Sequence, residues 1–245
     1  MPIIESQVDR DGDDYKRNRE KMLAAIAEFR DAEKSVQAMA EKARPRFAKR
    51  KQLMPRERIS LLLDRGAPFL ELMPLAGYRM HDDKDGSSAG GGSVAGIGYV
   101  EGVRCVVTAS NSAIKGGTVA PSGQRKGQRV QQIVLENKLP VVNLVESGGE
   151  IFVPGGRGFA NQARMSAMGI PQVTVVHGSS TAGGAYLPGL SDYVIMVRNQ
   201  AKVFLAGPPL LKAATGEIAT DEELGGAEMH ATVSGVAEWM AENDA

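Results

Sequence analysis

The segment PQVTVVHGSSTAGGAYLPGL, Pro171 to Leu190, joins a run of β-branched residues to a pair of adjacent glycines. Pro171 to His177 is short and apolar on both faces, which is typical of a strand buried in a parallel sheet. The pair Gly183 and Gly184 follows where a helix is expected to begin, although a glycine costs about 0.5–1 kcal/mol relative to alanine inside a regular element. Stability of the helix therefore does not explain the two glycines, and another role must.

The same order of strand, glycine loop and helix occurs upstream. Pro140 to Glu146 (PVVNLVE) predicts a second buried strand, which ends at Ser147-Gly148-Gly149. Hydrophobic patterning predicts further strands at 93–100, 103–110, 192–197 and 202–207, and helices at 121–137 and about 158–168. The pattern indicates an α/β protein. It differs from a doubly wound nucleotide-binding fold, because no G-x-G-x-x-G opens a helix after the first strand.

The first part of the chain reads as a charged helical extension. From about Asp14 to Ala48 the pattern predicts a long helix with a thin apolar stripe, made of Met22, Ile26, Phe29 and Val36. Such a stripe packs against another surface more often than it forms a core. We therefore divide the chain into an extension at 1–66 and an α/β domain at 67–245.

Two groups of cations are ambiguous. The segment 44–58 carries seven arginines and lysines, and this pattern fits a solvated basic face or a surface that faces phosphate groups. Arg125, Lys126 and Arg129 lie in the first half of the helix predicted at 121–137. Cations there oppose the helix macrodipole, which makes them candidates for ligand contacts.

Composition limits the possible functions. Lys+Arg and Asp+Glu balance at 29 each in 245 residues, so the overall charge favours neither nucleic acid nor an anionic membrane. No apolar run approaches the roughly 20 residues of a membrane span, and the acidic start resembles neither a secretory signal nor a transit peptide. A single cysteine, Cys105, excludes an intramolecular disulfide and a cysteine-based zinc site. We expect a cytoplasmic protein without a metal.

The glycine pairs suit a site built from backbone amides. Both pairs follow strands at the edge of the sheet where open α/β folds bind ligands. The first N–H groups of a helix have no internal partner, and glycine lets a ligand approach them without meeting a Cβ. Such donors stabilise an oxyanion, and each contributes about 2.7–4 kcal/mol to lowering a barrier. The alternative is that Gly183 and Gly184 only permit close packing of a helix on a strand.

Side chains for acid–base chemistry are scarce. His177 is either a general base or, as is more common for a histidine at a strand end, structural. Ser180 lies outside any nucleophile elbow, and carboxylates such as Glu146 and Glu150 cap loop backbone more often than they act as bases. This pattern favours chemistry in which a substrate or cofactor brings its own proton acceptor.

Longer motifs carry a family resemblance across nearly the whole chain. They are RERISLLLD (56–64), AGIGYVEG (95–102), KGGT (115–118), ESGG (146–149), GSSTAGGAYLPGLSD (178–192), FLAGPPLLKAATGE (204–217) and ELGGAEMH (223–230). In this order they resemble the carboxyltransferase β subunit of biotin-dependent acyl-CoA carboxylases. The motif sequences TAGGAY (181–186) and AGPPLLKAATGE (206–217) are more similar to those of the methylcrotonyl- and geranyl-CoA branch than to those of the propionyl-CoA branch.

The resemblance implies a crotonase-like fold of repeated ββα units with an N-terminal helical extension. In that family the N1 atom of biotin takes the substrate proton as carboxybiotin releases CO2, and the resulting enolate attacks the CO2. The positions that match the family's oxyanion donors are Gly183 and Gly184. The positions that match its acyl-CoA pocket are Lys115, Gly116, Gly117, Ser147, Gly148, Gly149, Thr181, Ala182 and Tyr186.

The resemblance also implies partners. Biotin would arrive as carboxybiotin on a separate carrier subunit, and a biotin carboxylase would load it with ATP, Mg and bicarbonate. Family members form dimers that assemble into a hexamer. No metal is expected on this chain.

The sequence departs from the family pattern in two places. Gly149 runs directly into Glu150, where family members insert several more residues, and the chain ends at about the point where a second crotonase-like half would begin. We therefore expect this chain to bind acyl-CoA without turning it over alone. The alternatives are the β subunit of a malonate-type decarboxylase and a non-catalytic acyl-CoA-binding or assembly module. An enoyl-CoA hydratase is disfavoured, because no acidic pair resembles its catalytic carboxylates.

Overall fold

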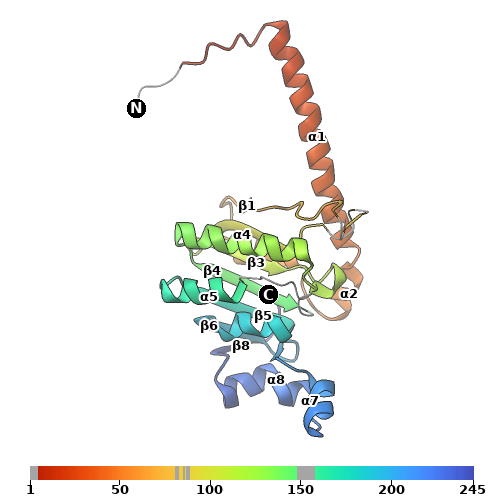
Figure 1. The fold of residues 1–245 in the computed structure, drawn as a ribbon, viewed down its shortest axis with the longest axis vertical. Coiled ribbons are helices and arrows are strands. Elements are labelled where there is room, and N and C mark those ends of the chain that lie inside the picture. Colours follow the sequence, from red (N-terminus) through yellow and green to blue (C-terminus); the bar gives the residue numbers. More distant parts are fainter. Residues whose placement is uncertain (1–4, 81–82, 85, 87–88, 148–157) are drawn as a thin grey trace.

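The computed structural model describes residues 5–80, 83–84, 86, 89–147 and 158–245, which form one mixed sheet flanked by helices (Figure 1). The strands are β1 (Leu70–Glu71), β2 (Ser93–Val100), β3 (Val103–Ser110), β4 (Val141–Ser147), β5 (Gln172–Thr181), β6 (Tyr193–Val197), β7 (Lys202–Phe204) and β8 (Trp239–Ala241). The helices are α1 (Asp13–Glu41), α2 (Arg44–Lys49), α3 (Pro55–Leu62), α4 (Pro121–Asn137), α5 (Gly158–Ala167), α6 (Tyr186–Gly189), α7 (Pro208–Thr215), α8 (Asp221–Gly225) and α9 (Ala227–Met229). Three short turns, η1 (Lys115–Gly117), η2 (Ala182–Ala185) and η3 (His230–Ser234), complete the described elements.

The sheet follows the order β1-β2-β3-β4-β5-β6-β8, and β7 pairs with β5. β2 and β3 form an antiparallel hairpin. From β3 onward the strands run parallel to one another, in the pairs β3–β4, β4–β5, β5–β6 and β6–β8. Parallel strands place their carboxyl ends at one edge of a sheet. The ends of β4 and β5 therefore lie side by side, with Ser147 opposite Ser180.

Alternate residues of the central strands point to opposite faces, so the sheet has a core on each side. On β3, Val106 packs under α4 and α5 with Val130, Val134 and Met165. Its neighbour Val107 instead packs under α3, with Ile59, Val94 and Leu144. A third cluster around Val176 and Met196 continues the core toward β7. The fold class predicted from the sequence is confirmed by a solved structure reported below.

The first predicted helix is wrong in its length. The sequence predicts one helix at 14–48, but α1 ends at Glu41 and α2 starts at Arg44. Pro45 explains the break, because proline lacks an N–H and is tolerated in the first helical turn but not inside a helix. The predicted division of the chain after residue 66 stays a prediction.

Most of the apolar stripe of α1 packs against nothing in the described chain. Met22, Ile26 and Phe29 are exposed, whereas Val36 near the end of the helix is buried. Figure 1 shows α1 projecting away from the sheet.

The strands around the glycine pair also differ from the prediction. The sequence predicts a strand at 171–177, but β5 continues to Thr181, because β7 pairs with its last residues. β7 itself ends at Phe204 rather than at residue 207. The helix expected at the glycine pair is a single 3₁₀ turn, η2, followed by the four-residue α6.

Candidate active site

Three loops meet around Ser147 at the carboxyl ends of β4 and β5. A Cβ atom built on Gly117 would lie 3.4 Å from the Cα of Ser147, and the Ser147 hydroxyl donates a hydrogen bond to the Gly117 carbonyl at 3.3 Å. From the other side, a Cβ atom on Gly184 would lie 3.6 Å from the Cβ of Ser147. The structure therefore brings η1, the end of β4 and η2 together, as the sequence predicts.

Two of these loops hold residues in the left-handed region of backbone conformation. Lys115 has φ 45° and Ala182 has φ 51°, although neither is a glycine, and Gly116 and Gly117 follow with φ 65° and 78°. A non-glycine residue in this region is strained by about 1–3 kcal/mol, and such strain clusters at functional sites. The strain therefore supports a role for the backbone of both loops.

Gly184 distinguishes the two interpretations of the glycine pair. A Cβ atom there would meet the Ser180 hydroxyl at 3.4 Å, which is an ordinary contact, and the φ of Gly184 is not in the left-handed region. Neither packing nor backbone conformation requires a glycine at this position. This favours the interpretation in which a ligand approaches the backbone.

The turn at the glycine pair is too short to build up a helix dipole. A macrodipole builds up over several turns, whereas η2 and α6 have four residues each. The turn is held by the Ser180 hydroxyl, which donates to the Gly184 carbonyl at 2.9 Å. The expectation that a full helix begins here is thus corrected.

The remaining predicted residues divide into two groups. Thr181 and Ala182 lie beside the glycine pair, and the exposed Tyr186 ring packs against Phe159 with centroids 4.6 Å apart and ring planes tilted by 46°. This aromatic pair offers an apolar surface next to η2. Gly148, Gly149 and Glu150 lie outside the described residues.

A buried ion cluster that the sequence did not predict lies behind the site. The Arg58 guanidinium donates to Asp244 at 2.7 Å and 3.0 Å, and to Glu146 at 3.1 Å. Asp244 also pairs with the Nδ1 atom of His177 at 2.8 Å. All four side chains are buried. In the sequence, Glu146 and His177 stand at the ends of two predicted strands. The structure pairs the preceding residues, Val145 and Val176, which places the two side chains on neighbouring strands.

His177 is a structural member of this cluster. Burial lowers its pKa, although the hydrogen bond to Asp244 opposes this, so the ring is neutral at neutral pH. A neutral ring donates its Nδ1 proton to Asp244 and leaves Nε2 buried without a partner in the described chain. Burial opposes ionisation of Asp244, but the hydrogen bond from His177 and the charge of Arg58 outweigh it and lower the pKa of that carboxyl.

The basic segment 44–58 is a strap across the ends of the strands. Arg46 donates to the Ser112 carbonyl at 2.8 Å, and the Gln52 side chain donates to the His177 carbonyl at 3.0 Å. Other arginines of the segment pair with carboxylates: Arg44 with Glu41 and Glu57, Arg50 with Glu146, and Arg56 with Glu71. Its arginines therefore mainly hold the strap in place, which favours a structural role over a phosphate-facing one.

Lys126 is likewise an internal contact rather than a candidate ligand contact. Its ammonium group is buried and donates to the carbonyls of Gly90 and Ser93 at 3.0 Å and 2.7 Å. Burial lowers the pKa of Lys126 to about 8. The side chain fastens α4 to the glycine loop that precedes β2.

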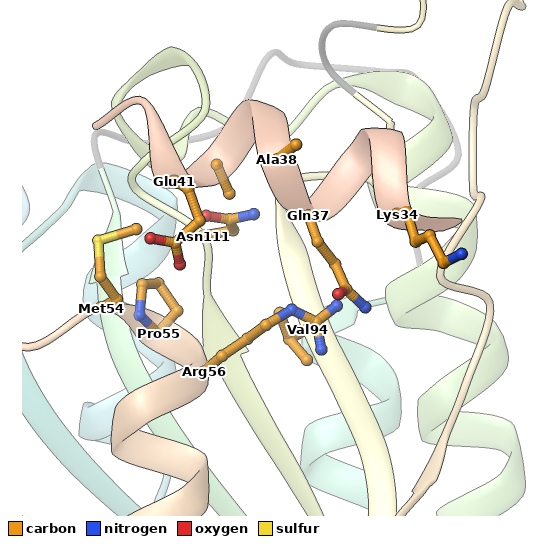
Figure 2. A pocket seen from close by; sticks show the side chains of 10 residues that line it. Lys34, Gln37, Ala38, Glu41, Met54, Pro55, Arg56, Val94 and Asn111 are labelled. Atoms are coloured by element: carbon orange, nitrogen blue, oxygen red, sulfur yellow. The ribbon is translucent and has the colours of Figure 1, made fainter. Parts of the chain in front are cut away.

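A cavity of about 300 Å³ lies elsewhere, between the last turns of α1 and the start of α3 (Figure 2). Gln37, Glu41, Arg56 and Asn111 are among its lining residues, and it contains none of the predicted site residues. Within the described ranges, acidic, histidine and cysteine side chains form no group that could hold a metal ion, and no helix there is long and apolar enough to cross a membrane.

Nearly the whole length of the chain is similar to known proteins. The family model described as the carboxyl transferase domain matches residues 46–245. The chain is 47% identical over 98% of its length to a probable biotin-dependent acyl-coenzyme A carboxylase beta2 subunit of Mycobacterium tuberculosis, and covers 46% of that protein. It is 44% identical over 99% of its length to a probable methylcrotonoyl-CoA carboxylase beta chain of Drosophila melanogaster, and covers 43% of that protein. The chain thus spans about half the length of the curated relatives it matches.

Solved structures show the same fold. The β subunit of geranyl-CoA carboxylase from P. aeruginosa superposes with a TM-score of 0.89 and is 65% identical, over 99% of this chain and 46% of that one. The transcarboxylase 12S structure superposes with a TM-score of 0.79 at 25% identity, over 91% of this chain and 45% of that one. This second match confirms the crotonase-like fold class.

Proposed function

Because the chain belongs to the carboxyl transferase domain family, we propose that it is the acyl-CoA-binding half of the carboxyltransferase in a biotin-dependent acyl-CoA carboxylase. The observation that carries this proposal is Gly184, which lies beside Ser147 although neither packing nor φ requires glycine there. The 65% identity to the geranyl-CoA carboxylase β subunit exceeds the 44% identity to a methylcrotonoyl-CoA relative. We therefore favour a branched, unsaturated acyl-CoA such as geranyl-CoA as the substrate.

In this proposal the chain's residues hold the thioester and stabilise negative charge. The N–H groups of Gly183 and Gly184 would donate to the oxygen that becomes an enolate, or to the ureido oxygen of biotin. Lys115 to Gly117, Ser147 to Gly149 and Thr181 to Ala182 would shape the acyl-CoA pocket, with Tyr186 at its rim. Amides fixed before the reaction stabilise developing charge without reorganising, which is why backbone donors suit this chemistry.

Carboxybiotin on a separate carrier would supply the carboxyl group and the proton acceptor. This requirement fits the described residues, because the side chains nearest Gly184 are the serines Ser180 and Ser147 rather than acids or bases, and the nearby His177 is engaged by Asp244. The partners in this proposal are a biotin carboxylase, which uses ATP, Mg and bicarbonate, the carrier subunit and further copies of this chain. We also propose a cytoplasmic location, although some relatives are described as mitochondrial.

Carboxylation by the natural gene product tests the proposal. It would be mixed with biotin carboxylase, carrier, ATP and labelled bicarbonate, and label incorporation into geranyl-CoA and 3-methylcrotonyl-CoA would be compared. We expect Gly184→Ala to lower kcat/KM by about 10²–10³-fold, because in this proposal the Gly184 amide is a donor that an added side chain would obstruct. Gly189→Ala is the matched control, since a Cβ atom there meets nothing within 4 Å. Full activity of Gly184→Ala would contradict the oxyanion role.

A malonate-type decarboxylase is the second candidate. The chain covers 79% of a chain in the Pseudomonas malonate decarboxylase MdcD-MdcE heterodimer, a larger share than for the carboxylases. The TM-score is only 0.59 and the identity 26%, so the carboxyltransferase remains favoured. Release of CO2 from a malonyl thioester, with no carboxylation of either acyl-CoA, would support the decarboxylase. Thioester binding without either activity would support a binding module.

A further inference from the structure

We infer that Glu146 is a positioning residue: its buried carboxylate, held by Arg58 and Arg50, fixes the three loops of the candidate site relative to one another. The inference rests on the proposed function, and it gives a catalytic consequence to the ion cluster behind the site. It follows from the contacts of Glu146 and from the charges that hold its carboxylate.

Glu146, near the end of β4, contacts η1 and the strand that leads into η2 directly, and it contacts η2 itself through its neighbour Ser147. Its carbonyl oxygen would lie 2.6 Å from a Cβ atom on Gly117, so η1 packs against it with no room for a side chain. Its side chain packs as closely against β5, since a Cβ atom on Gly178 would lie 2.6 Å from Cγ of Glu146. The next residue, Ser147, contacts Gly184. A shift of Glu146 would therefore move all three loops.

The carboxylate is held by two cations on the strap. Its Oε2 atom accepts from the buried Arg58 at 3.1 Å, and its Oε1 atom lies 3.5 Å from the half-exposed Arg50. With Asp244 as the second anion and a neutral His177, the formal charges of the cluster cancel. A balanced cluster has one favoured arrangement, because any displacement leaves a buried charge unpaired.

The same contacts argue against Glu146 as an acid or base. Both of its oxygens face guanidinium groups, one of them from Arg58 on α3. Its influence on a bound thioester would pass through Ser147 and Gly184. A positioning role predicts that kcat falls more than KM rises, because the loops still bind the ligand but no longer hold it at the reacting distance.

Glu146→Gln tests the inference against Glu238→Gln as the matched control. Glu238 also holds a strand through its carboxylate, which accepts from the Val194 amide at 2.6 Å, but at the amino end of β6. We would measure carboxylation kinetics, melting temperature, and hydrogen exchange of peptides covering 113–118, 178–186 and, as a reference, 103–110. Glu146→Asp keeps the charge and should recover part of the activity.

For Glu146→Gln we expect a roughly 10–100-fold lower kcat with KM changed by less than about threefold. Exchange in 113–118 and 178–186 should accelerate by about tenfold, with 103–110 unchanged. Glu238→Gln should lower only the melting temperature. Equal losses of kcat in the two variants at equal melting temperature, or unchanged exchange in both site peptides, would overturn the inference.

Misfolding of Glu146→Gln and inactivity of the unmodified protein would each leave a measurement that tests the inference. If Glu146→Gln does not fold, Arg50→Met removes only the half-exposed partner of the carboxylate, and it should show the same pattern with a smaller loss of kcat. If the unmodified protein carboxylates nothing, the proposed function fails, and hydrogen exchange alone then decides whether Glu146 positions the loops.

Discussion

Replacing Arg58 by methionine should be among the most destabilising single changes in this protein. The side chain donates three hydrogen bonds to two carboxylates, and Arg58, Glu146 and Asp244 are all less than 10% exposed. Methionine fills similar space but leaves Asp244 without a cation and Glu146 with only the half-exposed Arg50. Removing one partner from a buried ion pair costs about 3–5 kcal/mol, because the remaining charge stays desolvated.

Denaturation in urea and by heat measures this loss. For a domain of this size, each kcal/mol shifts the melting temperature by about 2–4 °C, so Arg58→Met should lower it by roughly 6–20 °C. Arg30→Met is the matched control, because Arg30 pairs with Glu33 at 3.0 Å on the exposed part of α1. Exposed pairs contribute about 0–1 kcal/mol, so the control should melt close to the unmodified protein.

A double-mutant cycle with Asp244→Asn isolates the pair. If the buried charge left behind causes the loss, then neutralising Asp244 in the Arg58→Met background should restore stability, with a coupling of about 0.5–3 kcal/mol. A loss below about 1 kcal/mol for Arg58→Met would refute the reasoning. Additivity of the two changes within about 0.5 kcal/mol would refute it as well.

Two other changes test the backbone of the site and the clasp on α4. Gly117→Ala should lower stability by about 1–3 kcal/mol more than Gly102→Ala. The two glycines have similar φ values, +78° and +75°, but only at Gly117 would an added Cβ atom meet the Glu146 carbonyl, at 2.6 Å. Chemical denaturation of both variants measures the difference, and equal losses of stability would contradict the prediction. Burial lowers the pKa of Lys126 from 10.5 to about 8, so the folded protein releases this proton before the unfolded chain does. Stability should therefore rise by about 1–3 kcal/mol between pH 8 and pH 10.5, and this rise should be absent in Lys126→Met when both proteins are denatured across that range.

Elements with local signals could be predicted from the sequence. The hairpin of β2 and β3 and the helix α4 have the predicted bounds, because two apolar runs flank the turn at Glu101-Gly102 and Pro121 marks the first turn of the helix. The meeting of Ser147 with the Gly183–Gly184 turn was expected, since loops after parallel strands lie at one edge of the sheet, whereas Lys115–Gly117 was named only through the family resemblance.

Features that depend on distant residues could not be predicted. β5 extends to Thr181 because β7 pairs with its end. The residues at 171–181 do not by themselves predict this pairing. The ion cluster is less visible still, because Arg58 and Asp244 are 186 residues apart and each reads as an ordinary surface charge in its own segment. Spacing within a segment reports local geometry, whereas a buried pair is defined by the packed sheet.

The proposed amide site gives the ion cluster a function. A catalytic side chain can rotate to compensate for a small displacement, but a backbone N–H moves only with its loop. Apolar packing alone would stabilise the ends of β4 and β5 as well as charges do, yet it is tolerant of small shifts. Buried charges are less tolerant, because each must keep its partner. In the proposal, a cluster that joins the strap, β4, β5 and Asp244 after β8 would therefore hold Gly117 and Gly184 at a set distance more strictly than apolar packing alone.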